Sequence, residues 1–152
     1  MHLALDASRV TVARRTGTER YALNLIRAML AQATPHRLSL YFRDPPAPGL
    51  LPDRPNVARY VKPFPRLWTH WRLAWELARP PRPDLLFVPA HVIPLICPVP
   101  AVVTVHDLGY RHFPDAHPWA QRQYLDFSTR YSAHAAVRVI VDSAATRRDL
   151  ER

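Results

Sequence analysis

Short apolar segments that end at polar residues recur along this chain, and this recurrence constrains its fold more than any other feature. The clearest segment covers residues 102–109, where a β-branched run stops at His106 and Asp107 before a glycine turn. Residues 3–6, 85–91 and 139–143 repeat the pattern. Continuous apolar runs of this length are typical of strands that are buried on both faces of a parallel sheet.

Helical patterns alternate with the strands. The strands are predicted at residues 2–6, 37–43, 57–62, 84–88, 99–105 and 137–141. The helices are predicted at residues 18–32, 67–79, 118–136 and from 144 to the end, with Pro118 at a first helical position and Ser143 as an N-cap. The proline-rich segment 44–55 is predicted to be a surface loop. This alternation over short connections predicts the α/β class, as a Rossmann-like parallel sheet with helices on both faces.

Length and composition place the chain among globular proteins. Its 152 residues, of which 48% are hydrophobic, suffice for one domain with a core. No stretch approaches the ~20 apolar residues of a membrane span, and the N-terminus lacks the basic and apolar regions of a signal peptide. The single cysteine, Cys97, excludes an internal disulfide. These features predict a cytoplasmic protein.

The charge of the chain is strongly positive. Lys and Arg total 21 against 12 Asp and Glu, which gives a net charge of +9, and every basic residue except Lys62 is arginine. Such an excess attracts anionic lipid, nucleic acid or phosphorylated substrates, although it also fits arginines that only coat the surface. No basic run is longer than two residues, and aromatic and basic residues are not interleaved on the strands. We therefore expect no nucleic-acid partner.

Histidines and aspartates follow neighbouring strands of the predicted sheet. Ligands of open α/β sheets bind beyond the carboxyl ends of the strands, where His106 and Asp107 would lie. We predict that these two residues are catalytic and that His91, in the turn after residues 84–88, binds substrate. In the structural alternative, Asp107 would cap its turn and His106 would be hydrogen-bonded in the core. The spacing of these side chains fits no metal motif, so no metal site is predicted.

The loop between the first strand and the first helix is a second candidate site. Its Gly17 lets a ligand approach the backbone, and the N–H groups at the start of the helix favour an anion. We predict that Gly17, Thr18 and Arg20 bind substrate. A single glycine does not make a dinucleotide-binding fingerprint, and the loop is not a P-loop. A plain capped turn is the alternative.

Aromatic residues dominate one side of two predicted helices. In helix 67–79, a helical wheel places Trp68, Trp71 and Trp75 together, and we predict that this side packs on the sheet. An apolar arc edged by tryptophan and arginine also fits a helix that lies on a membrane surface. The predicted apolar face of helix 118–136 consists of Trp119, Tyr124, Phe127, Tyr131 and Ala135.

Five segments, taken in order, resemble the N-terminal half of a family-four glycosyltransferase. They are residues 5–9, 16–21, 84–91, 103–108 and 139–150, which together span essentially the whole chain. The resemblance implies the GT-B fold, in which two Rossmann-like domains face each other across a cleft. Residues 1–152 would be the acceptor-side domain, and a domain that binds the nucleotide-sugar would follow. The last predicted helix has neither a C-cap glycine nor a closing proline, which also favours a chain cut within a longer protein.

The resemblance also implies a reaction. A sugar would be transferred from a nucleotide-sugar to a saccharide or lipid-linked acceptor, with retention of anomeric configuration, in the assembly of a polysaccharide or lipopolysaccharide. No metal or other cofactor is implied. This domain alone would be inactive, and the complete enzyme would be cytoplasmic, with peripheral contact to the inner face of the membrane as one alternative.

The resemblance assigns roles to the residues singled out above. The first-loop residues Gly17, Thr18 and Arg20 would approach the diphosphate of the donor or the acceptor. His91 would line the acceptor side. His106, with the neighbouring aspartate beside it, would contact the transferred sugar. Many family members carry two adjacent glycines in the first loop, whereas this chain has a threonine and a glycine there.

Two other classes of protein fit the sequence. One is a non-catalytic Rossmann-like module that binds a sugar or a phosphate, which saturable glycan binding by the chain alone would favour. The other is a basic adaptor that docks on a membrane or a nucleic acid through its arginines and the tryptophan helix. Binding that falls linearly with salt on a log–log scale would favour the adaptor.

Overall fold

The structure, a computed structural model, describes residues 1–113, 115 and 118–151. It contains a six-stranded, entirely parallel sheet with the strand order β3-β2-β1-β4-β5-β6. The predicted Rossmann-like α/β fold is confirmed. The strand order reverses between β1 and β4, and doubly wound sheets bind their ligands at such a reversal. The strands are β1 (His2–Asp6), β2 (Arg37–Phe42), β3 (Val57–Val61), β4 (Leu85–Val88), β5 (Ala101–Val105) and β6 (Arg138–Val141).

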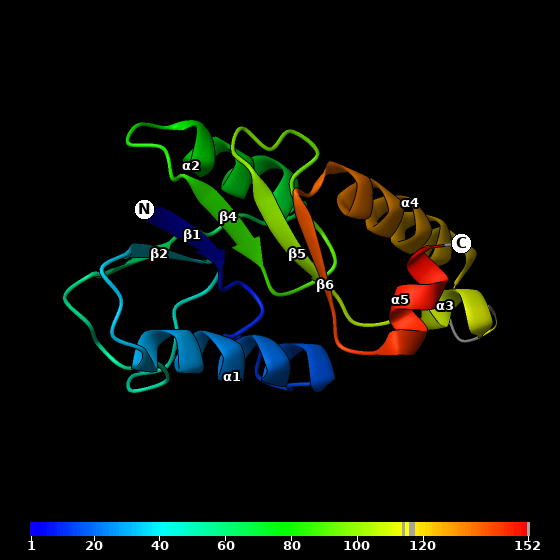
Figure 1. The fold of residues 1–152 in the computed structure, drawn as a ribbon, viewed down its shortest axis with the longest axis horizontal. Coiled ribbons are helices and arrows are strands. Elements are labelled where there is room, and N and C mark those ends of the chain that lie inside the picture. The colour runs from blue at the N-terminus through cyan, green and yellow to red at the C-terminus, as the bar shows by residue number, and fades with distance from the viewer. Residues whose placement is uncertain (114, 116–117, 152) are drawn as a thin grey trace.

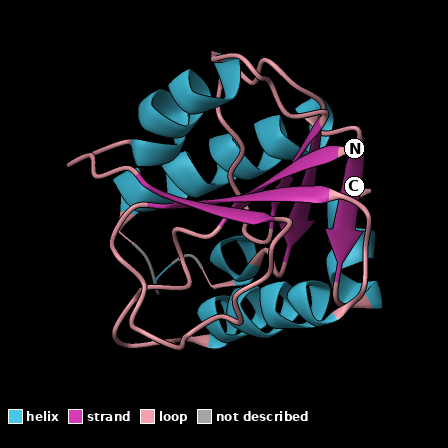
Figure 2. Cartoon of the chain, turned by 90° about the vertical axis from the view of Figure 1, so that its left-hand side faces the viewer, coloured by secondary structure: helices cyan, strands magenta, loops and turns pink. Residues whose placement is uncertain are grey.

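Helices cover both faces of the sheet, as the two views in Figure 1 and Figure 2 show. In Figure 1, α1 lies below the sheet, and α2 and α4 lie above it. A π-helical segment, η1 (Thr69–Leu73), runs directly into α2. None of the described helices is long and apolar enough to cross a membrane. The α-helices are α1 (Gly17–Ala31), α2 (Ala74–Ala78), α3 (Gly109–His112), α4 (Trp119–Ala135) and α5 (Ala144–Leu150).

Side chains that alternate along the strands divide the core into two layers. Phe87 of β4 packs on the α1 side together with Ile26. Its neighbour Leu86 packs on the other side, with Leu73 and Leu77 from η1 and α2. A parallel sheet needs both layers because it is buried on both faces. Because the two layers cover the faces of the sheet, the loops that follow the strands meet at its carboxyl edge.

The predicted elements are close to the observed ones. Each predicted strand is present within two residues of its expected bounds, and the short α3 was not predicted. Ser143 caps α5 as predicted, because its Oγ accepts a hydrogen bond from the Thr146 N–H at 3.0 Å. The last helix was predicted to reach Arg152, which lies outside the described residues.

The position predicted for Pro118 is wrong by one residue. Pro118 is the N-cap of α4, with an extended ψ of 143°, and Trp119 is the first helical residue. Both positions suit proline, because neither requires an N–H donor from it.

The prediction for the tryptophan helix is correct for one tryptophan and wrong for two. Trp68 is buried, with 5% of its surface exposed, but Trp71 and Trp75 are 63% and 62% exposed. Leu73 and Leu77 are fully buried instead. The wheel assumed 3.6 residues per turn, whereas the π-helical η1 shifts the later side chains around the axis.

The buried side of α4 also differs from the prediction. It holds the small polar residues Ser128, Thr129 and Ser132. The hydroxyl oxygen of Ser132 accepts the backbone N–H of Ile93 at 3.1 Å, so its burial is satisfied. Small side chains let the helix approach the sheet closely, and the larger aromatic rings turn outward. The rings that were predicted to be buried and are exposed belong to Trp119, Tyr124 and Phe127.

Candidate functional site

A cleft of 520 Å³ opens at the carboxyl edge of the sheet. The loops after β1, β2 and β4 form one side of it, and residues 67–70 together with α4 form the other. This is where doubly wound sheets bind ligands, and the volume suits a small molecule. The polar residues that line the cleft are Asp6, Ser8, Arg9, Thr18, Glu19, Arg43, Asp44, Thr69, His70, His91 and Tyr124.

His106 links the ends of three strands. Its Nδ1 lies 3.0 Å from a carboxylate oxygen of Asp142, and its Nε2 lies 3.1 Å from the carbonyl oxygen of Pro89. Both partners are acceptors, so the ring donates to both only when each nitrogen carries a hydrogen. The side chain is 9% exposed, and it is not among the residues that line the cleft. His106 therefore stands at the edge of the site, with both nitrogens already bound within the chain.

His91 lies in the loop after β4 and lines the cleft. Its role in substrate binding stays a prediction. Its ring meets the ring of His106 edge to face, with the centroids 5.3 Å apart. Burial lowers the pKa of His91, and the nearby His106 acts in the same direction. The ring of His91 is therefore uncharged at neutral pH, and it offers one donor and one acceptor nitrogen.

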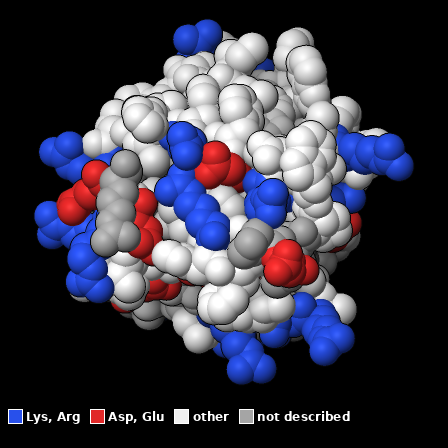
Figure 3. Space-filling view, turned by 90° about the vertical axis from the view of Figure 1, so that its right-hand side faces the viewer, with Lys and Arg blue, Asp and Glu red and all other residues white. Residues whose placement is uncertain are grey.

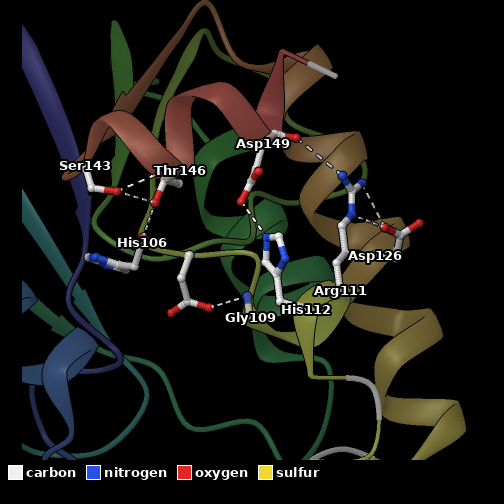
Figure 4. A network of polar contacts seen from close by, with 9 residues as sticks. His106, Gly109, Arg111, His112, Asp126, Ser143, Thr146 and Asp149 are labelled. Atoms are coloured by element: carbon white, nitrogen blue, oxygen red, sulfur yellow. Dashed lines mark hydrogen bonds and ion pairs between the residues drawn. The ribbon is translucent and has the colours of Figure 1, made fainter.

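Asp107 is exposed and is not among the residues that line the cleft. Its carboxylate accepts the backbone N–H of Gly109 at 2.8 Å, which is the turn cap of the structural alternative. Figure 4 shows how the end of β5 is joined to α5, because the Thr146 hydroxyl donates to the carbonyl of His106 at 2.8 Å. A catalytic role for Asp107 stays a prediction.

The start of α1 forms part of one wall. Thr18 lines the cleft, whereas Gly17 and Arg20 are exposed and outside its lining. The carboxylate of Glu19 accepts the backbone N–H of Thr16 at 2.9 Å and also the hydroxyl of Thr16, which caps the helix. Although burial acts to raise the pKa of Glu19, these hydrogen bonds and a nearby arginine lower it overall. A side chain at Gly17 would meet no atom within 4 Å, so packing does not require a glycine there.

Asp6 is a site residue that the sequence analysis missed. It ends β1, lines the cleft and is 4% exposed, and its carboxylate accepts the backbone N–H of Ser8 at 2.9 Å. Burial raises the pKa of Asp6, while the hydrogen bonds from Ser8 and the charge of Arg9 partly offset the effect. A signal was present, because residues 3–6 end at a polar side chain just as residues 102–106 do. Buried carboxyls in clefts are costly and gather at functional sites.

Asp6→Asn is expected to stabilise the chain at neutral pH. The pKa of Asp6 is raised in the folded state. The free energy of unfolding therefore decreases as the pH rises from ~3.9, the ordinary aspartate pKa, through the raised pKa of the folded state. Asparagine keeps an acceptor for the Ser8 N–H without the charge. Urea unfolding should show a gain in the free energy of unfolding at neutral pH that vanishes below the ordinary aspartate pKa. A variant less stable than the parent at neutral pH would contradict this expectation.

The opposite wall contains backbone that the sequence did not predict. Leu67 has a φ of 53°, in the left-handed region that is rare for leucine. The π-helical η1 follows it and carries His70, whose Nε2 lies 3.2 Å from the hydroxyl oxygen of Tyr124. Burial lowers the pKa of His70. Strained residues and π-helical turns both gather at functional sites, which supports including this wall in the site.

The cleft contains both hydrogen-bond donors and hydrogen-bond acceptors. Arg9 and Arg43 bring donors to it, and Asp6 and Asp44 bring acceptors. Uncharged His91 supplies one of each. This mixture suits a ligand rich in hydroxyl groups, because every hydroxyl both donates and accepts. Among the described residues, no group of three or more His, Cys, Asp or Glu side chains is placed to hold a metal ion.

Fold and site together define a Rossmann-like α/β domain with a polar ligand cleft at the carboxyl edge of its sheet. The family model of Glycosyltransferase Family 4 matches residues 15–152. The chain belongs to this family, which confirms the resemblance drawn from the five segments. None of the curated proteins matches the chain.

Proposed function

We propose that this chain is the acceptor-binding domain of a retaining GT-B glycosyltransferase. The complete enzyme transfers a sugar from a nucleotide-sugar to a saccharide or lipid-linked acceptor, and a second domain binds the nucleotide. Membership of glycosyltransferase family 4 supports the reaction class. The 520 Å³ cleft carries the assignment of acceptor binding, because a sheet of this topology receives its ligand there. Neither a metal nor another cofactor takes part in the proposed reaction.

His91 meets the acceptor in this proposal. It lines the cleft, and its uncharged ring can donate to one sugar hydroxyl or accept from it. His106 acts at the reaction centre, where an N–H group of its ring would stabilise the negative charge that develops on the leaving diphosphate. To contact the transferred sugar directly, the ring would have to replace its hydrogen bond to Asp142 with a hydrogen bond to the sugar. The side chain of Asp142 is 42% exposed. Asp107 holds the turn that follows His106.

The start of α1 meets the charged part of the donor or the acceptor. The N–H groups of its first turn have no acceptors within the helix, and such groups attract anions. Thr18 lines the cleft, Gly17 leaves its backbone open to a ligand, and Arg20 adds positive charge. The proposed place of action is the cytoplasm, with peripheral membrane contact and no nucleic-acid partner.

The reaction is tested with the natural polypeptide that carries this domain. It is incubated with UDP-, GDP- and ADP-sugars and with saccharide or polyprenyl-phosphate-linked acceptors, and the product is examined by NMR. The proposal predicts transfer that keeps the anomeric configuration of the donor, and no transfer by residues 1–152 alone. Inverted products would contradict retention. Transfer by residues 1–152 alone would contradict the need for a second domain.

His91→Ala is expected to weaken saccharide binding by about three- to tenfold, the effect of losing one neutral hydrogen bond. Calorimetric titration with malto-, chito- and manno-oligosaccharides measures this effect. His134→Ala is the matched control, because His134 is an exposed histidine on α4 that lies outside the cleft lining. If both variants bind with equal affinity, His91 is not an acceptor contact.

A further inference from the structure

Two exposed tryptophans stand on the helix that borders the cleft. Trp71 and Trp75 are four residues apart and are 63% and 62% exposed. Leu67, which is 55% exposed, precedes them, and the exposed arginines Arg79 and Arg82 follow. These five residues are called the docking face below.

Packing within the chain does not account for these tryptophans. The same helical segment already buries Trp68, Leu73 and Leu77 against the sheet. The helix on the other face, α1, has no large apolar side chain among the exposed residues that the structure describes. Exposed apolar clusters rimmed by polar residues are typical of interaction sites. The docking face is therefore a surface that another molecule would cover.

The charges around the docking face are positive. Glu76, the one acidic residue of η1 and α2, is paired with Lys62 at 3.2 Å and with Arg72 at 2.8 Å. Within the described part of the chain, no ion pair engages Arg79 or Arg82. The Nε of Arg82 donates to a backbone carbonyl, which leaves the terminal nitrogens of its guanidinium for an external group. Figure 3 views the molecule from the side of α4 and α5, where basic and acidic groups lie next to one another.

We propose that the docking face binds the surface of an anionic phospholipid bilayer. Tryptophan favours the membrane interface, where its ring is buried among lipid and its N–H stays near water. Arginines beside it attract anionic headgroups, and the net charge of +9 favours the same partner. This combination of an apolar centre and cationic ends matches a helix that lies in the plane of the interface.

The docking face and the cleft share Leu67. This residue lines the cleft and is also exposed beside the tryptophans. A bilayer on the docking face would therefore lie against the mouth of the cleft, where the headgroup of a lipid-linked molecule could enter. The inference does not depend on the proposed sugar transfer, because vesicle binding is measured without any reaction.

The test is flotation of the 152-residue chain with vesicles of phosphatidylcholine alone or mixed equally with phosphatidylglycerol. Binding is expected with the mixed vesicles and should weaken as salt is raised. The double variant Trp71→Ala, Trp75→Ala should bind the mixed vesicles at least about tenfold more weakly than the parent. The double variant Arg79→Gln, Arg82→Gln should lose about fivefold in binding for each arginine. Because all four side chains are exposed, thermal unfolding of the variants should match that of the parent.

Trp119→Ala is the control, because this tryptophan is 69% exposed but belongs to α4 and not to the docking face. It should bind the mixed vesicles like the parent. The proposal is overturned if the parent does not float with the mixed vesicles, or if the tryptophan double variant floats equally well. It is also overturned if Trp119→Ala loses as much binding as the double variant. The parent could instead form dimers and fail to bind vesicles. If the tryptophan double variant abolishes those dimers, the partner of the docking face is a second copy of the chain.

Discussion

Replacement of His106 by alanine is expected to lower the free energy of unfolding by about 2–3 kcal/mol. The ring loses its hydrogen bonds to the Pro89 carbonyl at 3.1 Å and to Asp142 at 3.0 Å, and the side chain is 9% exposed. The expected loss in the free energy of unfolding is not larger, because Asp142 is 42% exposed and solvent screens part of its interaction with His106. Urea unfolding of the 152-residue chain measures the loss.

The same change is expected to reduce turnover of the complete enzyme at least ~hundredfold, the effect of losing one group that stabilises developing negative charge. His112→Ala is the control, since His112 also pairs with a carboxylate, Asp149 at 2.7 Å, but its side chain is 54% exposed. That variant should lie within ~0.5 kcal/mol of the parent and keep its turnover. Equal stability losses in the two variants would show that His106 does not anchor the strand ends. Normal turnover in His106→Ala would remove His106 from the reaction centre.

Trp68→Ala is expected to cause the largest stability loss, about 3–5 kcal/mol. The indole is buried in the layer that holds Leu73 and Leu77, and its N–H donates to the Lys62 carbonyl at 2.6 Å. Truncation would leave both a cavity and an unsatisfied carbonyl. Trp68 also lines the cleft, so saccharide binding should weaken together with stability.

Trp71→Ala is the matched control for this change. The two tryptophans are three residues apart, but Trp71 is 63% exposed, so its replacement should change the free energy of unfolding by less than ~0.5 kcal/mol. Thermal and urea unfolding of the two variants compare them directly. Equal losses would mean that Trp71 is buried and that the helix follows the regular wheel after all.

The strands were predictable because a buried parallel strand needs a continuous apolar run, and residues 85–88 and 101–105 have that composition. The family was predictable from the order of five short segments. The position of the site followed from topology, because polar residues at strand ends meet at one edge of the sheet. Asp6 obeys this rule as well as His91 does, so the sequence contained the signal for both.

Other features depend on tertiary contacts that no local pattern encodes. The π-helical turn in η1 rotates Trp71 and Trp75 outward, and a wheel of constant pitch cannot anticipate it. The buried side of α4 holds small polar residues because Ser132 meets a backbone N–H from the loop after β4. The partners of His106 come from the ends of β4 and β6, which are distant in sequence.

Whether the cleft receives a sugar acceptor is most directly measured by amide chemical-shift mapping on the labelled 152-residue chain. Malto-, chito- and manno-oligosaccharides are titrated in turn. We predict saturable shifts for the amides of Asp6, Ser8, Thr18 and His91, which line the cleft, and none for Asn24 on the exposed side of α1. Saturable shifts confined to residues away from the cleft, or none with any saccharide, would contradict acceptor binding at this edge of the sheet.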